Sequence, residues 1–441
     1  MKPAITVIGG GLAGSEAAWQ IARTGLRVRL YEMRPHVSTP AHTTDQLGEL
    51  VCSNSLKSDL PGTAPYLLKQ ELRHLDSLLL RIADEVKVPA GHALAVDREK
   101  FCRRLTFEIS RIPEIEIVRQ EMCELPDGIT VVASGPLTSE SLSKSIVRFA
   151  GSQNLYFYDA ISPIVDSRTL DRSELFAASR YGKGGEDYLN AFLSREEYAR
   201  FYEALIGAES VPLHSFEHAM YFEGCLPIEE LARRGVDTLR FGPMKPVGLL
   251  DPRTGKRPHA AVQLRLENLM ADSYNLVGFQ NHLKFPEQKR VFRMIPGLRN
   301  AEFLRFGQIH RNSYIHSPRL LLPTLQTRTR PDLFFAGQIC GVEGYVESIA
   351  TGLLAGINAG RLAGGREPLS PPPWTACGSL GHYISNDGLE KFQPVNMSFG
   401  ILPAAPVKQK GGRRDRKERH RVQVEEALKA MDQWIRSLAV Q

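Results

Sequence analysis

Three glycines near the N-terminus constrain the fold of this 441-residue chain more than any other feature. Gly9, Gly11 and Gly14 form a Gly-x-Gly-x-x-Gly motif. The motif follows an apolar run at residues 4–8, which is typical of a strand, and it opens a segment whose apolar residues recur at helical spacing. A second apolar run at 28–31 predicts the next strand. The pattern therefore predicts a Rossmann-like strand–helix–strand unit that binds a dinucleotide.

Each position of the motif has a physical role in such a unit. Gly9 permits the tight turn, Gly11 lets the backbone approach a pyrophosphate, and Gly14 lets the helix pack closely on the strand. Glu32, about twenty residues further on, ends the second strand and is expected to accept hydrogen bonds from the adenosine ribose. This motif alone does not separate FAD from NAD. The candidate cofactor-binding residues here are Gly9, Gly10, Gly11, Leu12, Ala13, Gly14 and Glu32.

A second segment, residues 332–361, favours FAD. It reads as an apolar strand, a glycine turn and a helix with small residues, and it resembles the late element that closes the FAD site in flavoproteins of the glutathione-reductase type. Gln338 stands where those proteins usually have an acid. We find no second complete glycine motif after a strand, so no dedicated NAD(P)H domain is expected. The candidate residues in this segment are Gly337, Gln338, Glu343 and Gly344.

The spacing of the sheet strands predicts an inserted domain. About 200 residues separate the apolar run at 130–133 from the one at 333–336, whereas a crossover between parallel strands needs only a dozen or so. We therefore predict an α/β fold, a Rossmann-like FAD-binding domain of the glutathione-reductase type with an inserted α+β domain. The predicted limits are 1–164 and 311–407 for the FAD-binding domain, 165–310 for the inserted substrate- and RNA-binding domain, and 408–441 for a basic linker and an amphipathic C-terminal helix.

Composition narrows the class of protein further. Apolar residues make up 42% of the chain, and no run of about 18 apolar residues suggests a membrane span. The N-terminus lacks the features of a secretory signal, so a cytoplasmic protein is expected. The six cysteines show no metal-ligand spacing, so no metal site is expected and the thiols should be reduced.

The positive charge is concentrated in two places. The net charge is +6, and residues 408–421 hold eight Lys/Arg against two acids, which leaves 47 of the 55 basic and 47 of the 49 acidic residues elsewhere. Residues 240–265 hold six Lys/Arg against Asp251. Such runs indicate an anionic partner such as RNA, although the first run is equally consistent with a solvated tail. Residues 424–438 carry an apolar stripe that predicts docking on the body of the protein or on a partner chain.

Two cysteines and one short string are candidates for chemistry. Cys52 follows an apolar run in a polar loop, and Cys225 lies between a glycine and a Pro-initiated helix, whose N-terminus favours a thiolate. Cys102 lies at helical spacing among apolar residues and is expected in the core. His282 and Lys284 interrupt an apolar pattern; His282 either contacts a ring substrate or is structural.

A series of strings spread along the chain closely resembles one family. This family is the folate- and FAD-dependent tRNA uracil-5-methyltransferases, and the resemblance runs from the first strand to about Val407, leaving the tail outside it. The related wobble-uridine-modifying flavoproteins share chiefly the glycine motif and the late flavin helix. The strings, in order, are GGGLAGSEAAWQ, YEMRP, LVCSNSLKSD, VPAGHALAVDR, ASGPLTSESL, FEGCLPIEELARRG, FGPMKPVGL, GFQNHLKFPEQ and LFFAGQICGVEGYVESIATGLLAGINAGR.

The resemblance implies a reaction that the residues tolerate. Uracil C5 is a poor nucleophile until a thiolate adds to C6. The family assigns this role to the cysteine matching Cys225, and a second required thiol, matching Cys52, lies beside the flavin; the division of roles between the two stays open. 5,10-Methylenetetrahydrofolate donates the one-carbon unit, reduced FAD supplies the hydride, and NAD(P)H reduces the flavin. His282 matches the imidazole that holds the folate ring, and Lys284 helps to hold RNA or folate anions.

The implied product is 5-methyluridine at position 54 of the tRNA T-loop. The same chemistry on ribosomal RNA is an alternative that the sequence leaves open, and an RNA-binding flavoprotein without catalysis is another. A small-molecule oxidoreductase would be indifferent to RNA. The sequence does not indicate an oligomeric state.

Overall fold

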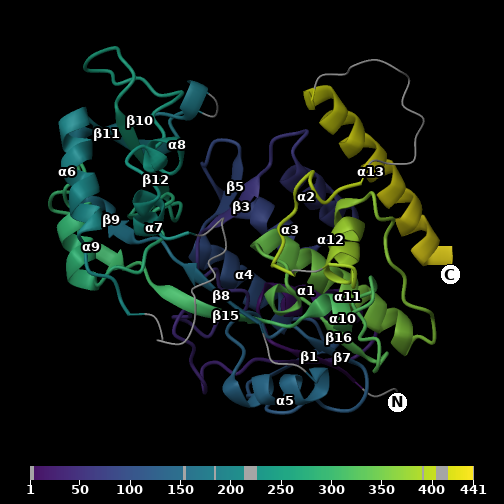
Figure 1. Ribbon diagram of the computed structural model, residues 1–441. Helices are drawn as coiled ribbons and strands as arrows, with labels where there is room; N and C mark the ends of the chain where they lie inside the picture. Colours follow the sequence, from purple (N-terminus) through teal and green to yellow (C-terminus); the bar gives the residue numbers. More distant parts are fainter. Residues whose placement is uncertain are drawn as a thin grey trace.

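A five-stranded parallel sheet, whose strand β1 leads into the N-terminal glycine motif, forms the centre of the larger part of the molecule (Figure 1). The computed structural model describes residues 4–151, 155–182, 185–212, 226–389, 392–403 and 416–440. The strand order is β16-β7-β1-β2-β6. The strands are β1 (Ile5–Ile8), β2 (Val28–Tyr31), β6 (Ile115–Val118), β7 (Thr130–Val132) and β16 (Leu333–Phe335). The predicted strands at both ends of the chain thus join one sheet, because β16 pairs with β7.

Two long helices from distant parts of the sequence lie side by side against this sheet. Helix α1 (Leu12–Ala22) follows β1, and α11 (Tyr345–Ala363) is the predicted late helix. A Cβ atom at Gly352 of α11 would lie 2.2 Å from the carbonyl oxygen of Ala13, so only glycine fits at this crossing. The small residues of the late segment therefore serve close packing between helices within one domain.

Further helices and a small sheet complete the larger part. Helix α2 packs beside α11 and α12. The helices are α2 (Ala64–His74), α3 (Leu78–Glu85), α4 (Arg98–Ser110), α5 (Glu140–Ala150), α10 (Ser317–Leu320) and α12 (Ala376–Ile384). The small antiparallel sheet contains β3 (Ser55–Ser58), β5 (Ala93–Val96) and β4 (Lys87–Val88).

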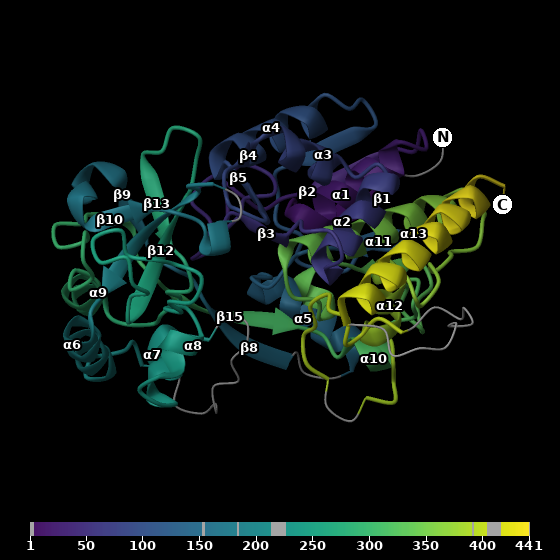
Figure 2. The same cartoon turned by 90° about the horizontal axis from the view of Figure 1, so that it is seen from above.

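A second, six-stranded antiparallel sheet has its own apolar core and lies to one side of the first part (Figure 2). Its order is β10-β11-β12-β13-β9-β14. The strands are β9 (Ile164–Asp166), β10 (Leu175–Ala177), β11 (Tyr188–Leu193), β12 (Ala260–Leu266), β13 (Ser273–Leu276) and β14 (Phe303–Arg305). Its helices are α6 (Arg195–Ile206), α7 (Ile228–Arg233), α8 (Thr238–Phe241) and α9 (Phe285–Phe292). This is the inserted α+β domain that the sequence predicted.

The chain enters and leaves the inserted domain through one antiparallel pair of strands. These are β8 (Leu155–Ala160) and β15 (Ile309–Tyr314), which lie between the two parts in both views. The domain limits at 164/165 and 310/311 stay a prediction.

The C-terminal helix α13 (Arg416–Val440) packs along the outer edge of the larger part, beside α2 (Figure 1). Its apolar stripe is buried in the main core; it contains Val424, Ala427, Met431 and Trp434. The ring Nδ1 of His74 on α2 lies 2.8 Å from a carboxylate oxygen of Asp432. The stripe, predicted to dock on the body or on a partner chain, packs on the body. Residues 404–415, with part of the basic run, lie outside the described residues.

Candidate functional site

A cleft opens at the carboxyl ends of the parallel strands. It encloses about 1040 Å³, part of which is open to solvent, and its walls come from the segments that follow β1, β2, β6, β7 and β16. Open α/β sheets bind their ligands at this edge. The predicted cofactor residues that line the cleft are Gly9, Gly11, Leu12, Ala13, Glu32, Gly337 and Gln338.

The glycines at the start of α1 have two different effects. On the cleft side they leave space for a ligand, and on the sheet side they let the helix pack so closely that no side chain would fit. A Cβ atom at Gly14 would lie 1.8 Å from the carbonyl oxygen of Gly9, so the helix packs directly on the turn. A Cβ atom at Gly11 would have no protein atom within 4 Å, although Gly11 lines the cleft. The backbone at Gly11 is therefore open to close approach by a phosphate at the helix N-terminus.

Glu32, at the end of β2, is held by the motif itself. One carboxylate oxygen accepts hydrogen bonds from the backbone N–H of Gly10 at 3.1 Å and from Arg34 Nη2 at 3.2 Å. The other accepts from the backbone N–H and Nε of Arg34 at 3.0 and 2.9 Å. Burial alone would raise the pKa of Glu32, but the contacts with Arg34 outweigh it and hold the pKa below its usual value. If Glu32 accepts the predicted hydrogen bond from a ribose, the accepting oxygen also keeps one of these protein donors.

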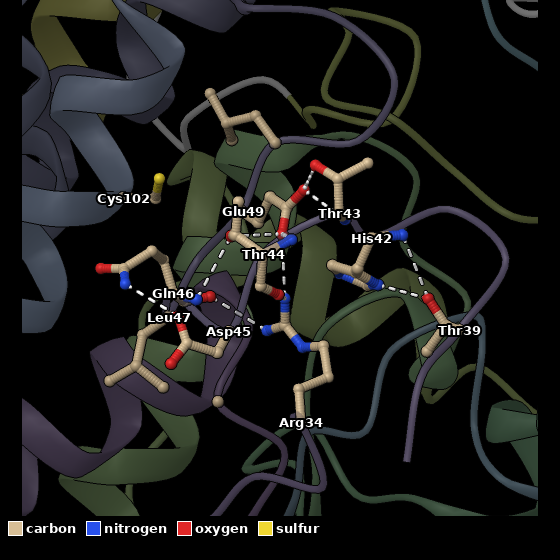
Figure 3. A network of polar contacts seen from close by, with 12 residues as sticks. Arg34, Thr39, His42, Thr43, Thr44, Asp45, Gln46, Leu47, Glu49 and Cys102 are labelled. Atoms are coloured by element: carbon tan, nitrogen blue, oxygen red, sulfur yellow. Dashed lines mark hydrogen bonds and ion pairs between the residues drawn. The ribbon is translucent and has the colours of Figure 1, made fainter. Parts of the chain in front are cut away.

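Arg34 also organises the loop that closes this end of the cleft (Figure 3). Its guanidinium lies 3.1 Å from Glu49 and donates to the carbonyl oxygens of Thr44 and Gln46 at 3.0 and 3.1 Å. Glu49 in turn accepts from the hydroxyl and the backbone N–H of Thr43 and Thr44. Burial acts to raise the pKa of Glu49, but these hydrogen bonds lower it overall. The loop therefore presents its cleft-facing residues, Thr39 and His42, in a fixed arrangement, with a contact of 2.6 Å between them.

The late segment supplies the other wall of the cleft. Gly344 is the N-cap of α11, and Tyr345 and Ser348 in the first turn line the cleft, so the positive end of this helix faces it. Gln338 Nε2 donates to Glu343 at 2.5 Å. Flavoproteins of the glutathione-reductase type usually have an acid at the position of Gln338, directly after the glycine. In this chain the carboxylate of Glu343 lies beside Gln338 instead.

These features fit FAD on the chemistry of the donors. Two helix N-termini, those of α1 and α11, face the same cleft, and a Cβ atom at Gly11 would meet no protein atom, so the backbone there is open to a pyrophosphate. The other predicted cofactor residues, Gly10, Gly14, Glu343 and Gly344, are not among those that line the cleft.

Cys52 lies in a loop at the rim of this cleft. Its backbone N–H donates to the Tyr345 hydroxyl at 2.8 Å, as does that of Ser53 at 3.1 Å. Val51, the preceding residue, and Tyr345 both line the cleft. Burial raises the pKa of Tyr345, so its hydroxyl stays protonated. The loop places the partly exposed Cys52 next to the proposed flavin site.

Cys225, the other candidate, lies outside the described residues, which resume at Leu226. Pro227 is the N-cap of α7, in agreement with the predicted Pro-initiated helix. Glu229 in the first turn of α7 is fully buried, and one of its carboxylate oxygens lies 2.8 Å from both the backbone N–H and the ring Nδ1 of His282. His282 is therefore joined to the helix that follows Cys225.

His282 and Lys284 differ in exposure. The side chain of His282 is 5% exposed, whereas that of Lys284 is 48% exposed and pairs with Glu209 at 2.5 Å. Neither lines the cleft described above. Their contact with a substrate stays a prediction. Cys102 is buried, with its pKa raised to about 11 chiefly by burial, and the expectation of a core thiol is confirmed.

Sequence reasoning missed several residues that shape the cleft. Arg34, His42 and Tyr345 line it, as does the turn at residues 134–139 after β7. Their positions directly after predicted strands, or at the start of the predicted late helix, were the available signal. Arg98 and Arg305, whose guanidinium groups donate to the carbonyl oxygens of residues 50 and 51, gave no such signal, because they come from distant elements.

Fold and cleft define the class as a Rossmann-type, FAD-binding flavoprotein. The profile of the family described as glucose inhibited division protein A matches residues 4–367. The solved structure of Aquifex aeolicus GidA in its form II crystal is similar, with a TM-score of 0.72 and 20% identity; the match covers 99% of this chain and 74% of that one. At that identity the likeness shows the fold.

Curated relatives are closer in sequence. A protein of Koribacter versatilis named methylenetetrahydrofolate--tRNA-(uracil-5-)-methyltransferase TrmFO is 58% identical over 99% of this chain and 98% of its own. One of Solibacter usitatus with the same name is 59% identical over 98% and 99%. The chain belongs to the TrmFO family. The match with the first relative also corrects the expectation that the resemblance ends near Val407, because it leaves almost none of the tail outside.

Within the described ranges, no helix combines the length and apolar character that a membrane span requires.

Proposed function

We propose that this protein transfers a one-carbon unit from 5,10-methylenetetrahydrofolate to C5 of a uridine in tRNA, position 54 of the T-loop, and forms 5-methyluridine there. Relatives with the corresponding name cover nearly the whole chain at 58 and 59% identity. The single observation that carries the proposal is the link between Cys52 and the cleft. The backbone N–H of the partly exposed Cys52 is held by the hydroxyl of Tyr345, and Tyr345 lines the cleft suited to FAD.

The chain's thiols supply the activation that uracil needs. A thiolate adds to C6, forming a sulfur–carbon bond, and the displaced electron pair gives C5 enolate character. C5 then forms a bond to the one-carbon unit, the C5 proton leaves, and the sulfur–carbon bond breaks to restore the pyrimidine and the thiolate. We assign the addition to C6 to Cys225 and a second required thiol to Cys52.

The cleft residues hold the cofactor. Gly9, Gly11 and the N-terminus of α1 are placed for the pyrophosphate, and Glu32 for the adenosine ribose. Gly337, Gln338 and the first turn of α11 form the opposite wall. Bound in its reduced form, FAD supplies the hydride that turns a methylene into a methyl group. NAD(P)H is the proposed external reductant.

Substrate recognition falls to the inserted domain. His282, held in one orientation by the buried carboxylate of Glu229, is the proposed contact for the folate ring, and Lys284 for anions of folate or RNA. Of the six basic residues in 240–265, Arg240 and Arg253 are paired with neighbouring carboxylates and Arg265 is buried. Besides Arg253, which is exposed but paired with Asp251, the exposed members are Lys245, Lys256 and Arg257, and we assign these three to RNA phosphates.

The proposal is tested by measuring which RNA receives a labelled one-carbon unit. The flavin-loaded protein is incubated with NADPH, folate labelled on the methylene carbon, and either a tRNA transcript, the same transcript with cytidine at position 54, or a ribosomal RNA fragment. Label in the first alone supports the proposal. Label in the ribosomal fragment alone would replace the substrate, and a protein that binds tRNA yet labels none of the three would be a non-catalytic RNA-binding flavoprotein.

A further inference from the structure

The loop that carries Cys52 is held on both sides of the thiol by long-range contacts. The carbonyl oxygen of residue 50 accepts a hydrogen bond from Arg98 Nη1, and that of residue 51 accepts one from Arg305 Nη2. The next backbone N–H, that of Cys52, donates to Tyr345 at 2.8 Å. Two adjacent peptide groups, 50–51 and 51–52, are therefore bound to side chains from three different elements.

These contacts come from both domains. Arg98 opens α4 and Tyr345 opens α11, which belong to the part that contains the cleft. Arg305 ends β14 of the six-stranded sheet. On the far side of the thiol, Asn54 Nδ2 donates to the carbonyl oxygen of Leu266 at the end of β12, at 2.8 Å. The placement of the inserted domain is thus transmitted to the backbone immediately before and shortly after Cys52.

The arginines near the Cys52 loop outnumber the carboxylates that pair with them, which is unfavourable for stability. Glu267 pairs with Arg98, at 2.9 Å from Nη2, and its charge also acts on the guanidinium groups of Arg265 and Arg305. Burial and then the charge of Arg98 lower the pKa of Arg305 to about 10. Arg265 is 7% exposed, and its Nε has no hydrogen-bond partner among the described residues.

Burying cations in excess of anions costs free energy, and a neutral donor would satisfy the carbonyl of residue 51 at a lower cost. Residues that violate such packing rules are expected at functional sites rather than in structural contacts. Arg305 has a planar guanidinium that fixes direction as well as distance, so it suits the task of placing one peptide group.

We propose that Arg305 is a positioning residue for Cys52. Arg305 belongs to the inserted domain and binds the carbonyl oxygen of Val51. The position of the Cys52 thiol beside the cleft therefore depends on how the inserted domain is placed. The role of that thiol in methylation rests on the proposed function, but the positioning itself does not.

The experiment compares Arg305→Ala and Arg305→Lys with a matched control, Arg293→Ala. Arg293 lies in the same domain and also donates its guanidinium to a backbone carbonyl, that of Ala301, at 2.9 and 3.1 Å. The full-length, flavin-loaded proteins are treated with a limiting amount of iodoacetamide, and peptide mass spectrometry gives the ratio of alkylated Cys52 to alkylated Cys123. Cys123 is exposed and serves as the internal reference.

Loss of a charge-assisted hydrogen bond should raise the population of open loop states, so the ratio should rise by about fivefold in Arg305→Ala. Arg305→Lys, which keeps the charge, should fall between this variant and the parent, and Arg293→Ala should match the parent. The turnover number for tRNA methylation should fall as the alkylation ratio rises, and the KM for methylenetetrahydrofolate should stay unchanged.

An unchanged ratio in Arg305→Ala, or an equal rise in Arg293→Ala, would overturn the proposal. If Arg305→Ala does not fold, the comparison of Arg305→Lys with Arg293→Ala decides in the same way. A changed ratio in a protein whose parent does not methylate tRNA would leave the positioning intact and refute the proposed function instead.

Discussion

Gly11 and Gly14 lie three residues apart in one motif, but their replacement by alanine should have different effects. At Gly11 the backbone has φ −75° and ψ −166°, which alanine adopts without strain, and the added methyl group would point into the cleft rather than at protein. At Gly14 the methyl carbon would lie 1.8 Å from the carbonyl oxygen of Gly9, a backbone atom that cannot rotate away. The first change should therefore affect the cofactor and the second the fold.

The expected magnitudes differ accordingly. At the N-cap of α1, Gly11→Ala should cost the protein about 0.5–1 kcal/mol of stability. In the holoprotein, a methyl group where the pyrophosphate approaches should cost roughly 1.4–2.7 kcal/mol of binding, a 10- to 100-fold loss of FAD affinity. Gly14→Ala gains about 1 kcal/mol of helix propensity but loses more to the overlap, for a net loss of at least about 2 kcal/mol.

Two measurements separate the variants. Reconstitution of the apoproteins with FAD, followed by flavin fluorescence, gives affinity, and urea unfolding of the same apoproteins gives stability. Wild-type FAD affinity in Gly11→Ala would refute the placement of the cofactor. Wild-type stability in Gly14→Ala would refute the packing of α1 on the turn.

Three further outcomes are expected. Burial raises the pKa of Glu71 to about 7 from 4.5, so the folded state binds its proton more tightly and loses up to about 3 kcal/mol of stability as the pH rises from about 4.5 to 7. Glu71→Gln should flatten this loss in urea unfolding at several pH values; an unchanged pH dependence would contradict the shift. Neutralising Lys245, Lys256 and Arg257 together should lower the slope of log affinity for tRNA against log salt by about 2–3, and an unaltered slope would remove them from the RNA interface. His282→Ala should raise the KM for methylenetetrahydrofolate without loss of bound flavin, whereas an unchanged KM would make this residue structural.

The sequence predicted those parts of the fold that local patterns determine. The glycine motif, the strands on either side of it and the late helix follow from spacing within about thirty residues, and each lies in the structure where the pattern placed it. The inserted domain followed from chain length, since a crossover does not need about 200 residues. The stripe on α13 was equally local, but the choice between the body and a partner required the fold.

The arrangement around Cys52 was beyond such reasoning. Arg305 meets the loop 254 residues away in sequence, and Tyr345 contacts Cys52 across 293 residues. No periodicity connects such positions, and an arginine at the end of a strand is ordinarily a solvated side chain. The same holds for Glu32, whose acceptor sites are shared with Arg34 only because residues 34–49 fold back over the strand end.

The most direct test of the central claim is covalent capture of RNA by Cys225. The flavin-loaded protein, Cys225→Ala and Cys52→Ala are incubated with methylenetetrahydrofolate, NADPH and tRNA that carries 5-fluorouridine at position 54, and the protein–RNA adduct is measured on a denaturing gel. Fluorine at C5 blocks loss of the proton, so the sulfur–carbon bond cannot break. The account predicts an adduct with the parent and none with Cys225→Ala; equal trapping by these two proteins would contradict it.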